Sequence, residues 1–482
     1  MFQALLLRLF DGRSILGRDE PKGEIPPAPR ILRDTLQIAW PSILESFLVA
    51  LVGVIDTIMV GTLGSAAIAA VGLCTQPKFI ALALFLSMNV AVSAIVARRK
   101  GQEDRESANL VLSQALAVTI LLIPAMLSGL PDILLVVVVS LLTVAFAPQI
   151  LRLAGSNPDT HRDAVLYYRI IMGGLFFNAC SLVINAAQRG AGNTRIAMRT
   201  NMVSNGVNIC FNYLLIGGKL GFPSMGVAGA ALATVLGTVA ALGMSLYSVS
   251  HPEGYLHLEP RRLFCFRRDT LASLWSVSSS TLVEQVFLRV GFLSFAMIVA
   301  RLGTQPFAAH QAGMNILTIS FSLGDGLSVA AVALVGQSLG QGRPDLARIY
   351  GGACQRVGIL FSALVCLVFS TQGRRIFSLF FQEEAVLAEG VTLMRLAAAV
   401  VFLQISQVVF SGCLRGAGDV RYMALVSLSS ATIARPVLGW LFCYGFGLGL
   451  AGAWIGLTLD QALRLLLSGA RFVSGKWTRI KI

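Results

Sequence analysis

Charged residues are scarce in this chain. Asp, Glu, Lys and Arg make up 13% of its 482 residues and hydrophobic residues make up 55%, whereas a soluble domain carries roughly 25% charged residues. The mean hydropathy is +0.75. So few charges cannot supply a solvated surface over the whole length, which excludes an ordinary soluble protein.

Motifs of metal binding are lacking too. The eight cysteines are scattered singly, mostly within apolar stretches, with no C-x-x-C and no Cys/His cluster, so we expect neither disulfides nor a metal site. No H-E-x-x-H occurs, and an intramembrane enzyme would have to rest on an unrecognised pair of acids. The N-terminal segment MFQALLLRLFDGR has no basic leader and no small-residue cleavage site. We therefore expect a cytoplasmic tail at the membrane surface there, and not a signal peptide.

Apolar runs of about 20 residues recur along the chain, which is the length that crosses ~30 Å of hydrocarbon. They predict six membrane spans in each half of the chain. The expected spans of the first half are about 36–62, 70–97, 107–147, 164–187, 195–216 and 226–249. Those of the second half are about 271–299, 306–338, 346–371, 390–413, 421–443 and 450–470.

The third stretch, 107–147, is long enough for two spans, with Gly129-Leu130-Pro131-Asp132 as a candidate turn. The distribution of basic residues decides between twelve and thirteen spans, because Lys and Arg concentrate in cytoplasmic loops. Twelve spans place 26 of the 38 Lys and Arg in inner segments and 7 in outer loops, Lys78 among them. A thirteenth span would move the basic cluster at 261–268 outside. We therefore expect twelve spans with an insertion near 123–135. The same distribution accounts for the net charge of +14 without a nucleic-acid partner.

The chain contains an internal repeat. The tetrapeptide R-G-A-G occurs at residues 189–192 and again 226 residues later, at 415–418. Four further landmarks recur in the same order: 32–36 as 267–271, 63–64 as 302–303, 101–102 as 340–341, and 226–230 as 449–453. Many secondary transporters are built from such duplicated membrane units.

An even number of spans in each repeat makes the repeats parallel. The expected fold class is an all-α membrane protein, with two six-helix bundles related by a pseudo-two-fold axis along the membrane normal. Two cytoplasmic tails, two bundles and a cytoplasmic linker are expected at 1–30, 31–250, 251–268, 269–471 and 472–482. We expect the R-G-A-G segments to be scaffold, since Gly permits a tight chain reversal and Arg would anchor the helix end at the headgroups.

Asp56 is the clearest functional candidate. It lies within the first span, where an ionisable side chain is costly and marks a functional site by default. No basic residue lies near it in that span. Such a carboxyl group favours its protonated form in a low dielectric, so it could bind and release a proton near neutral pH. The alternative is a protonated Asp that makes a structural hydrogen bond.

Asparagines form two stripes in the first repeat. Four in the fifth span fall at i, i+4, i+7 and i+11, on one helix face: Asn201, Asn205, Asn208 and Asn212. Asn178 and Asn185 are seven residues apart on one face of the fourth span. Thr234 of the sixth span could join them. A polar cavity and inter-helix packing both explain this pattern.

The second repeat mixes acids and arginines within its spans. These are Glu284, Asp325, Asp460, Arg289, Arg356, Arg395, Arg435 and Arg464. Asp460 and Arg464 are four residues apart on one helix, so we expect them to pair. Glu284, in the middle of the seventh span, is the candidate for a second ion site, with an internal ion pair as the alternative. Gln404 matches Asn178 at the 226-residue offset, so both repeats place polar groups at equivalent points.

These residues together resemble the multidrug and toxic compound extrusion (MATE) family, in its bacterial form, over about 31–470. The resemblance rests on Trp40-Pro41, on residues 54–64 (VIDTIMVGTLG), on Ala308-Ala309-His310-Gln311 and on the two R-G-A-G segments. It implies a V-shaped pair of six-helix bundles. By position, Asp56 matches the family's ion-coupling acid, Asn208 and Asn212 its polar pair, and Thr234 a partner in the sixth helix. Some members have Asp in place of Asn212, and sodium-coupled members have Asp in place of Gln404. These departures favour Asp56 as the coupling residue.

The resemblance implies export of organic cations and other amphipathic drugs across the bacterial inner membrane in exchange for H⁺ or Na⁺. Na⁺, if it is the coupling ion, would bind at Asp56, and no other cofactor is expected. We expect a monomer with both termini in the cytoplasm. A lipid-linked saccharide flippase of the same superfamily is the alternative. It would need more basic residues around the cavity than the first repeat offers, and an intramembrane enzyme is a remote alternative.

Overall fold

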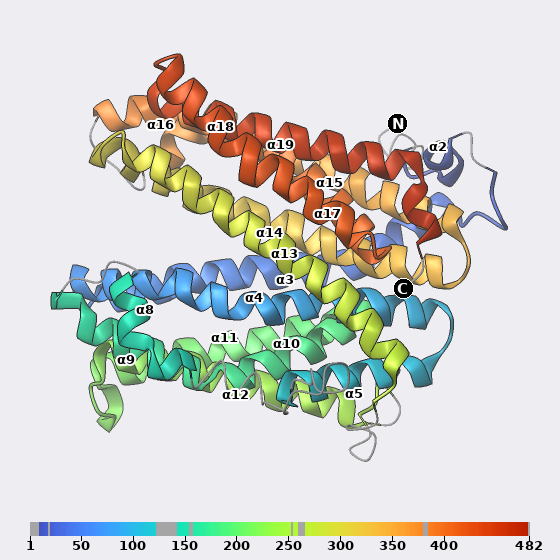
Figure 1. The fold of residues 1–482 in the computed structure, drawn as a ribbon, viewed down its shortest axis with the longest axis horizontal. Coiled ribbons are helices and arrows are strands. Elements are labelled where there is room, and N and C mark those ends of the chain that lie inside the picture. Colours follow the sequence, from blue (N-terminus) through green and yellow to red (C-terminus); the bar gives the residue numbers. More distant parts are fainter. Residues whose placement is uncertain are drawn as a thin grey trace. The chain divides into compact units, whose positions relative to one another are not determined.

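The computed structural model describes residues 9–17, 20–121, 142–153, 158–251, 254–258, 266–378 and 384–480. This part of the chain is helical and contains no strand (Figure 1). The expected insertion near 123–135 lies outside the described residues. The chain is therefore an all-α protein, as its composition predicts.

Nine helices in the described residues are long and apolar enough to cross a membrane. They are α3 (Ala28–Gly61), α4 (Ser65–Gly101), α12 (Gly226–Ser250), α13 (Arg268–Ala300), α14 (Thr304–Gly340), α15 (Pro344–Phe377), α16 (Glu384–Gly416), the stretch α17–η3–α18–η4, and α19 (Gly449–Ser474). The composite stretch consists of α17 (Val420–Ser427), η3 (Leu428–Ala434), α18 (Arg435–Trp440) and η4 (Leu441–Gly445). Both η segments in it are π-helical.

Three more predicted spans have described helices. The fourth is a pair, α9 (Pro158–Gly173) and α10 (Leu175–Gly190), bent by 47° at the break between them. The third begins as α5 (Arg105–Leu121), and the fifth is α11 (Thr194–Gly217), whose asparagines lower its hydropathy. Short elements complete the fold: α2 (Gly12–Leu16), α8 (Ala147–Leu153), η1 (Lys219–Gly221) and η5 (Lys476–Arg479).

The predicted span over 164–187 is a bent pair of helices. The helix breaks at Gly174, between α9 and α10. A Cβ atom at Gly174 would lie 2.6 Å from Cγ2 of Val235 on α12. Glycine therefore lets α12 approach the break closely, and two consecutive glycines, Gly173 and Gly174, weaken the helix at that point.

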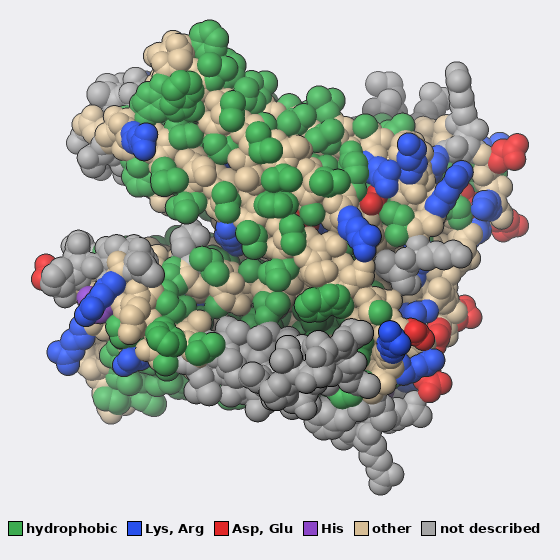
Figure 2. Space-filling model, in the orientation of Figure 1, with side chains coloured by type: hydrophobic (Ala, Val, Ile, Leu, Met, Phe, Trp, Pro, Cys, Tyr) green, Lys and Arg blue, Asp and Glu red, His purple; other side chains and the backbone are tan. Residues whose placement is uncertain are grey.

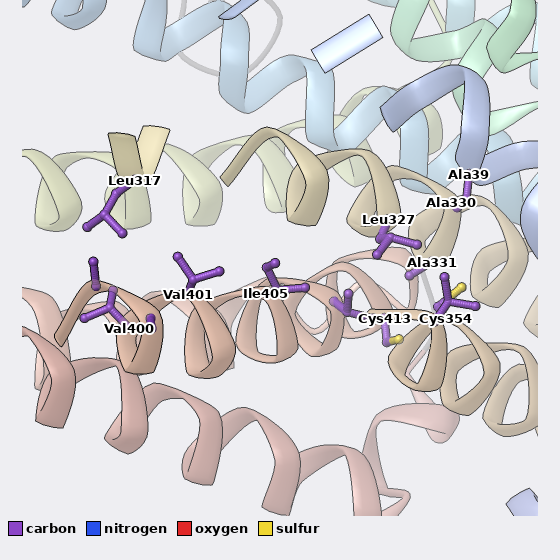
Figure 3. Close-up of a cluster of buried hydrophobic side chains, with 14 of the residues drawn as sticks. Ala39, Leu317, Leu327, Ala330, Ala331, Cys354, Val400, Val401, Ile405 and Cys413 are labelled. Atoms are coloured by element: carbon purple, nitrogen blue, oxygen red, sulfur yellow. The ribbon is translucent and has the colours of Figure 1, made fainter. Parts of the chain in front are cut away.

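The helices form two compact units. One contains 1–47, 97–103 and 279–482, and the other contains 48–96 and 104–278. In the first unit α16 packs against α14, α15 and α19. Leu317 and Leu327 of α14 meet Val401 and Ile405 of α16 in its core (Figure 3). In the second unit α12 packs against α9, α10 and α11, over a core that includes Tyr168, Met172 and Leu175.

Large apolar side chains cover much of the outside of these helices. Ile58, Ile80, Leu293 and Leu466 are each more than 60% exposed, at 65%, 67%, 62% and 68%. Figure 2 shows hydrophobic side chains over the helix faces, with Lys, Arg, Asp and Glu mainly toward the helix ends. Such apolar surface marks contact with lipid, so the chain is a multi-pass membrane protein.

The R-G-A-G segments are scaffold, and their two glycines have different tasks. The second glycine makes the turn, because Gly192 and Gly418 have φ of 79° and 85°, a conformation that other residues rarely adopt. The first glycine packs against the neighbouring helix. A Cβ atom at Gly416 would lie 2.6 Å from the carbonyl oxygen of Val332 on α14, and one at Gly190 would clash with the carbonyl oxygen of Ser93 on α4.

We expect Gly416→Leu to destabilise the protein. The new side chain has to separate α16 from the α14 backbone, and overpacking of this kind costs about 1–3 kcal/mol. Thermal unfolding of the purified protein, followed by tryptophan fluorescence, measures the loss. Gly243→Leu in α12 is the matched control, since a Cβ atom there meets nothing within 4 Å. Equal unfolding temperatures for the two variants would contradict the packing role of Gly416.

Candidate functional site

Asp56 lies in a cluster of polar side chains within the unit that contains 48–96 and 104–278. The Nδ2 group of Asn212 donates a hydrogen bond to Oδ1 of Asp56 over 2.7 Å. With the Asn208 amide oriented to satisfy both of its polar atoms, its nitrogen donates to the same oxygen over 2.8 Å, and its oxygen accepts from Oγ1 of Thr234 over 3.2 Å. The structure therefore brings together four of the seven predicted site residues. Their role in transport stays a prediction.

The close approach of α11 and α12 positions this cluster. A Cβ atom at Gly237 of α12 would lie 2.7 Å from the carbonyl oxygen of Ser204 and 3.3 Å from Cβ of Asn208. Ser204 also donates to the Gly237 carbonyl over 2.8 Å. Asn208 and Asn212 are 5% and 1% exposed, so their amides need partners inside the protein. Asp56 provides one for each.

Lys78 corrects two expectations. It was counted with the basic residues of the outer loops, although the predicted span 70–97 contains it, and the structure places it inside α4, directly after Pro77. The first repeat was expected to have no basic residue near its polar cluster. In the folded unit, however, the Lys78 ammonium lies close enough to Asp56 and to Cys74 for charge interactions with both. The charge count misled because it assigned Lys78 to a loop, whereas a basic side chain that faces an acid can lie within a span.

The surroundings of Asp56 also include α9. The Cys74 thiol donates to the carbonyl oxygen of Ala164 on α9 over 3.3 Å. Tyr167, one turn further along α9, is 8% exposed and interacts electrostatically with both Cys74 and Asp56. Sequence reasoning missed Cys74 and Tyr167, since neither stands out from the apolar residues around it.

The stripe of Asn178 and Asn185 does not reach this cluster. Asn185 accepts from Ser245 of α12 over 3.3 Å and donates to Ser181 over 3.4 Å, a separate contact between α10 and α12. Asn178 is half-buried and makes no hydrogen bond to Asp56 in the described part of the chain. Its counterpart Gln404 has a buried Oε1 with no hydrogen-bond partner among the described residues.

Glu284 is held in an ion pair in the other unit. Arg415, the arginine of the second R-G-A-G segment, donates to Oε1 of Glu284 over 2.6 Å, and Ser427 donates to the same oxygen over 3.5 Å. Asp325 of α14 is near enough to interact with Arg415. The arginine was expected to anchor at the headgroups, but it points into the bundle. Glu284 thus forms an internal ion pair, which was the alternative to its being a second ion site.

Asp460 forms ion pairs with two arginines. Arg464 donates to Oδ1 of Asp460 over 3.2 Å, as the four-residue spacing predicts. Arg435 of α18 adds two hydrogen bonds to Oδ2 over 2.9 and 2.6 Å, and its guanidinium lies 4.5 Å from the ring centroid of Phe292. Arg435 and Asp460 are 1% and 0% exposed. Charge-assisted hydrogen bonds of this kind fix helix positions, so this group is structural.

No arrangement for catalysis emerges from the described residues. A G-x-S-x-G pattern does occur at 336–340, but it lies within α14, where the Ser338 hydroxyl donates to the carbonyl oxygen of Leu334 over 2.8 Å. A nucleophile elbow needs a sharp strand-to-helix turn instead. Within the described ranges, no group of three or more His, Cys, Asp and Glu residues could hold a metal ion.

The chain is similar to known transporters over nearly its whole length. The family model described as MatE matches residues 41–214 and 281–441. The probable multidrug resistance protein NorM of Thermotoga maritima is 27% identical over 470 residues, which are 95% of each chain. The multidrug resistance protein MdtK of Edwardsiella ictaluri is 26% identical over 455 residues, which are 92% of this chain and 95% of the relative.

Solved structures share the fold. The outward-facing conformation of a multidrug resistance MATE family transporter of the MOP superfamily matches with a TM-score of 0.82 and 20% identity, over 94% of this chain and 100% of that one. A crystal structure of MATE in the straight conformation matches with a TM-score of 0.83 and 20% identity, over 96% of this chain and 99% of that one. The family match covers more than half of the sequence, and the chain therefore belongs to the MatE family.

Proposed function

We propose that this protein is a secondary antiporter that exports cationic or amphipathic drugs in exchange for H⁺ or Na⁺. It would act in the bacterial inner membrane as a monomer, with both termini in the cytoplasm. Family membership and the relatives named multidrug resistance proteins support this function, and they do not favour the flippase alternative. The observation that carries the proposal is the hydrogen bond of 2.7 Å between Asn212 and an acid inside a membrane helix, Asp56.

In this proposal, ion binding at Asp56 changes the contact between α3 and α11. Asp56 belongs to α3, whereas its donors Asn208 and Asn212 belong to α11. A bound proton or Na⁺ takes up lone pairs of the carboxylate that otherwise accept these amides. The contact between α3 and α11 then weakens, and substrate bound beside them is released outward. The two bundles would alternate access by rocking.

Export should depend on an ion gradient across the membrane. Efflux of a fluorescent cation from vesicles that contain the purified protein, first with an imposed H⁺ gradient and then with a Na⁺ gradient, tests this. We expect one gradient to drive export and its collapse by an ionophore to stop it. Vesicles without protein give the background. Equal efflux with and without gradients would contradict the proposed antiport.

A further inference from the structure

Lys78 is the one charged side chain in the described structure that both interacts with Asp56 and lies within a span of the same unit. It lies four residues after Cys74, on the same face of α4. The Cys74 thiol donates to Ala164 of α9, so this face of α4 is directed into the unit. Lys78 thus points toward the polar cluster, and not toward lipid.

The ammonium group acts on Asp56 through its charge. The hydrogen bonds of Asp56 in the described structure come from Asn212 and Asn208, not from Lys78. The Asp56 and Lys78 side chains both stay partly exposed. A ligand can therefore reach either group without breaking a direct ion pair. Cys74 and Tyr167 are the other ionisable groups near Asp56, and both are neutral near pH 7 at their ordinary pKa values.

Opposite charges on two neighbouring helices favour a particular ligand. A simple organic cation is attracted by Asp56 but repelled by Lys78, and the two effects oppose each other when its distances to the two groups are similar. A zwitterion can place its cationic nitrogen at Asp56 and its acidic group at Lys78, so both interactions are attractive. Oriented charge pairs discriminate between ligands in this way.

We propose that Asp56 and Lys78 are the two poles of the substrate site and that Lys78 makes the transporter prefer zwitterionic substrates, which carry a cationic nitrogen and a carboxylate. This inference rests on the proposed function, which places substrate beside Asp56. It adds Lys78 as a specificity-determining residue. The preference is a property of binding and is measured without an ion gradient.

Two dyes that differ by one methyl group test the preference. Tetramethylrhodamine is a zwitterion with a free carboxylate, and its methyl ester is a cation of nearly the same size and shape. Their binding to the purified full-length protein in detergent is measured by fluorescence anisotropy. We expect the wild-type protein to bind the zwitterion about tenfold more tightly than the ester, the discrimination that 1.4 kcal/mol provides.

Variants of Lys78 separate recognition from a merely structural role. Lys78→Met should reverse the preference, because the ester gains affinity when the repelling charge is removed and the zwitterion loses its partner. Lys78→Arg should retain the wild-type preference. Lys219→Met is the matched control, since Lys219 lies in η1 with its ammonium 4.1 Å from the ring centroid of Tyr213. Its preference should equal that of the wild type. Monodisperse elution in size-exclusion chromatography establishes that each variant is folded.

The outcomes are distinct from those that test the proposed function. A wild-type protein that binds the ester as tightly as the zwitterion overturns the inference, even if the protein exports cations from vesicles. A change by the same factor for both dyes in Lys78→Met also overturns it, since loss of fold would do this. Absence of gradient-driven export would overturn the proposed function alone.

Discussion

Asp56→Asn is expected to abolish gradient-driven export and drug resistance without reducing the amount of protein in the membrane. Asparagine has nearly the shape of aspartate and keeps an oxygen that accepts from Asn212, which now donates to Asp56 over 2.7 Å. The fold should therefore tolerate it. Asparagine cannot take up a proton, and its neutral oxygen is a much weaker ligand for Na⁺ than a carboxylate. The coupling ion then has no site.

Resistance of cells that lack their own efflux pumps, together with vesicle efflux and quantification of membrane protein, measures this effect. We expect a loss of at least about 100-fold in transport rate, the size of effect typical when a group that transfers a proton is removed. Asp34→Asn makes the same change in the same helix, at a carboxylate that accepts from the Tyr350 hydroxyl over 2.8 Å. This control should transport normally. Full transport by Asp56→Asn would refute the coupling role.

Most of the fold could be predicted from the sequence, because lipid restricts the backbone to a few structures. Inside hydrocarbon every backbone polar group must be satisfied within the segment, so long apolar runs have to be helices. The repeated glycines add information, since Gly416 and Gly418 are required by close packing and by a positive φ. The break at Gly174 was missed because glycine is common in membrane helices and only some glycines bend them.

Site residues could be predicted where they lie on one helix and follow its period. Asn208 and Asn212 are one turn apart on α11, so their common face follows from the helical period. The partners from other helices could not be found in this way. The roles of Lys78 and Arg435 depend on the packing of α4 and α18 against other helices, and the partner of a charge within a span cannot be read from its own helix.

The ion pairs of the second repeat show the same limit. The pairing of Asp460 with Arg464 follows from a spacing of four residues, whereas Arg415 and Glu284 lie on different helices and are 131 residues apart in the sequence. A buried charge must find a partner, so sequence analysis can state that Glu284 has one. It cannot say which arginine, because five lie within the predicted spans of that repeat. Arg415 was not among them.

Asp460→Asn should destabilise the protein strongly. Asp460 is fully buried and accepts from both Arg435 and Arg464. Its removal leaves two buried guanidinium groups that have lost their carboxylate, and breaking a buried ion pair on one side costs about 3–5 kcal/mol. Thermal unfolding of the purified protein in detergent should show a clear fall in midpoint temperature, with the folded fraction in the membrane reduced.

A second change distinguishes lost pairing from lost packing. The double variant Arg435→Met with Asp460→Leu removes the more buried of the two arginines together with the carboxylate. Replacement of buried ions by apolar side chains of similar volume is often neutral or stabilising, and Arg464 retains Glu284 as a nearby negative charge. We therefore expect the double variant to unfold at a higher temperature than Asp460→Asn. If it unfolds at the same temperature or lower, the contribution of Asp460 is its shape and not its charge, and the three residues would not act as one structural group.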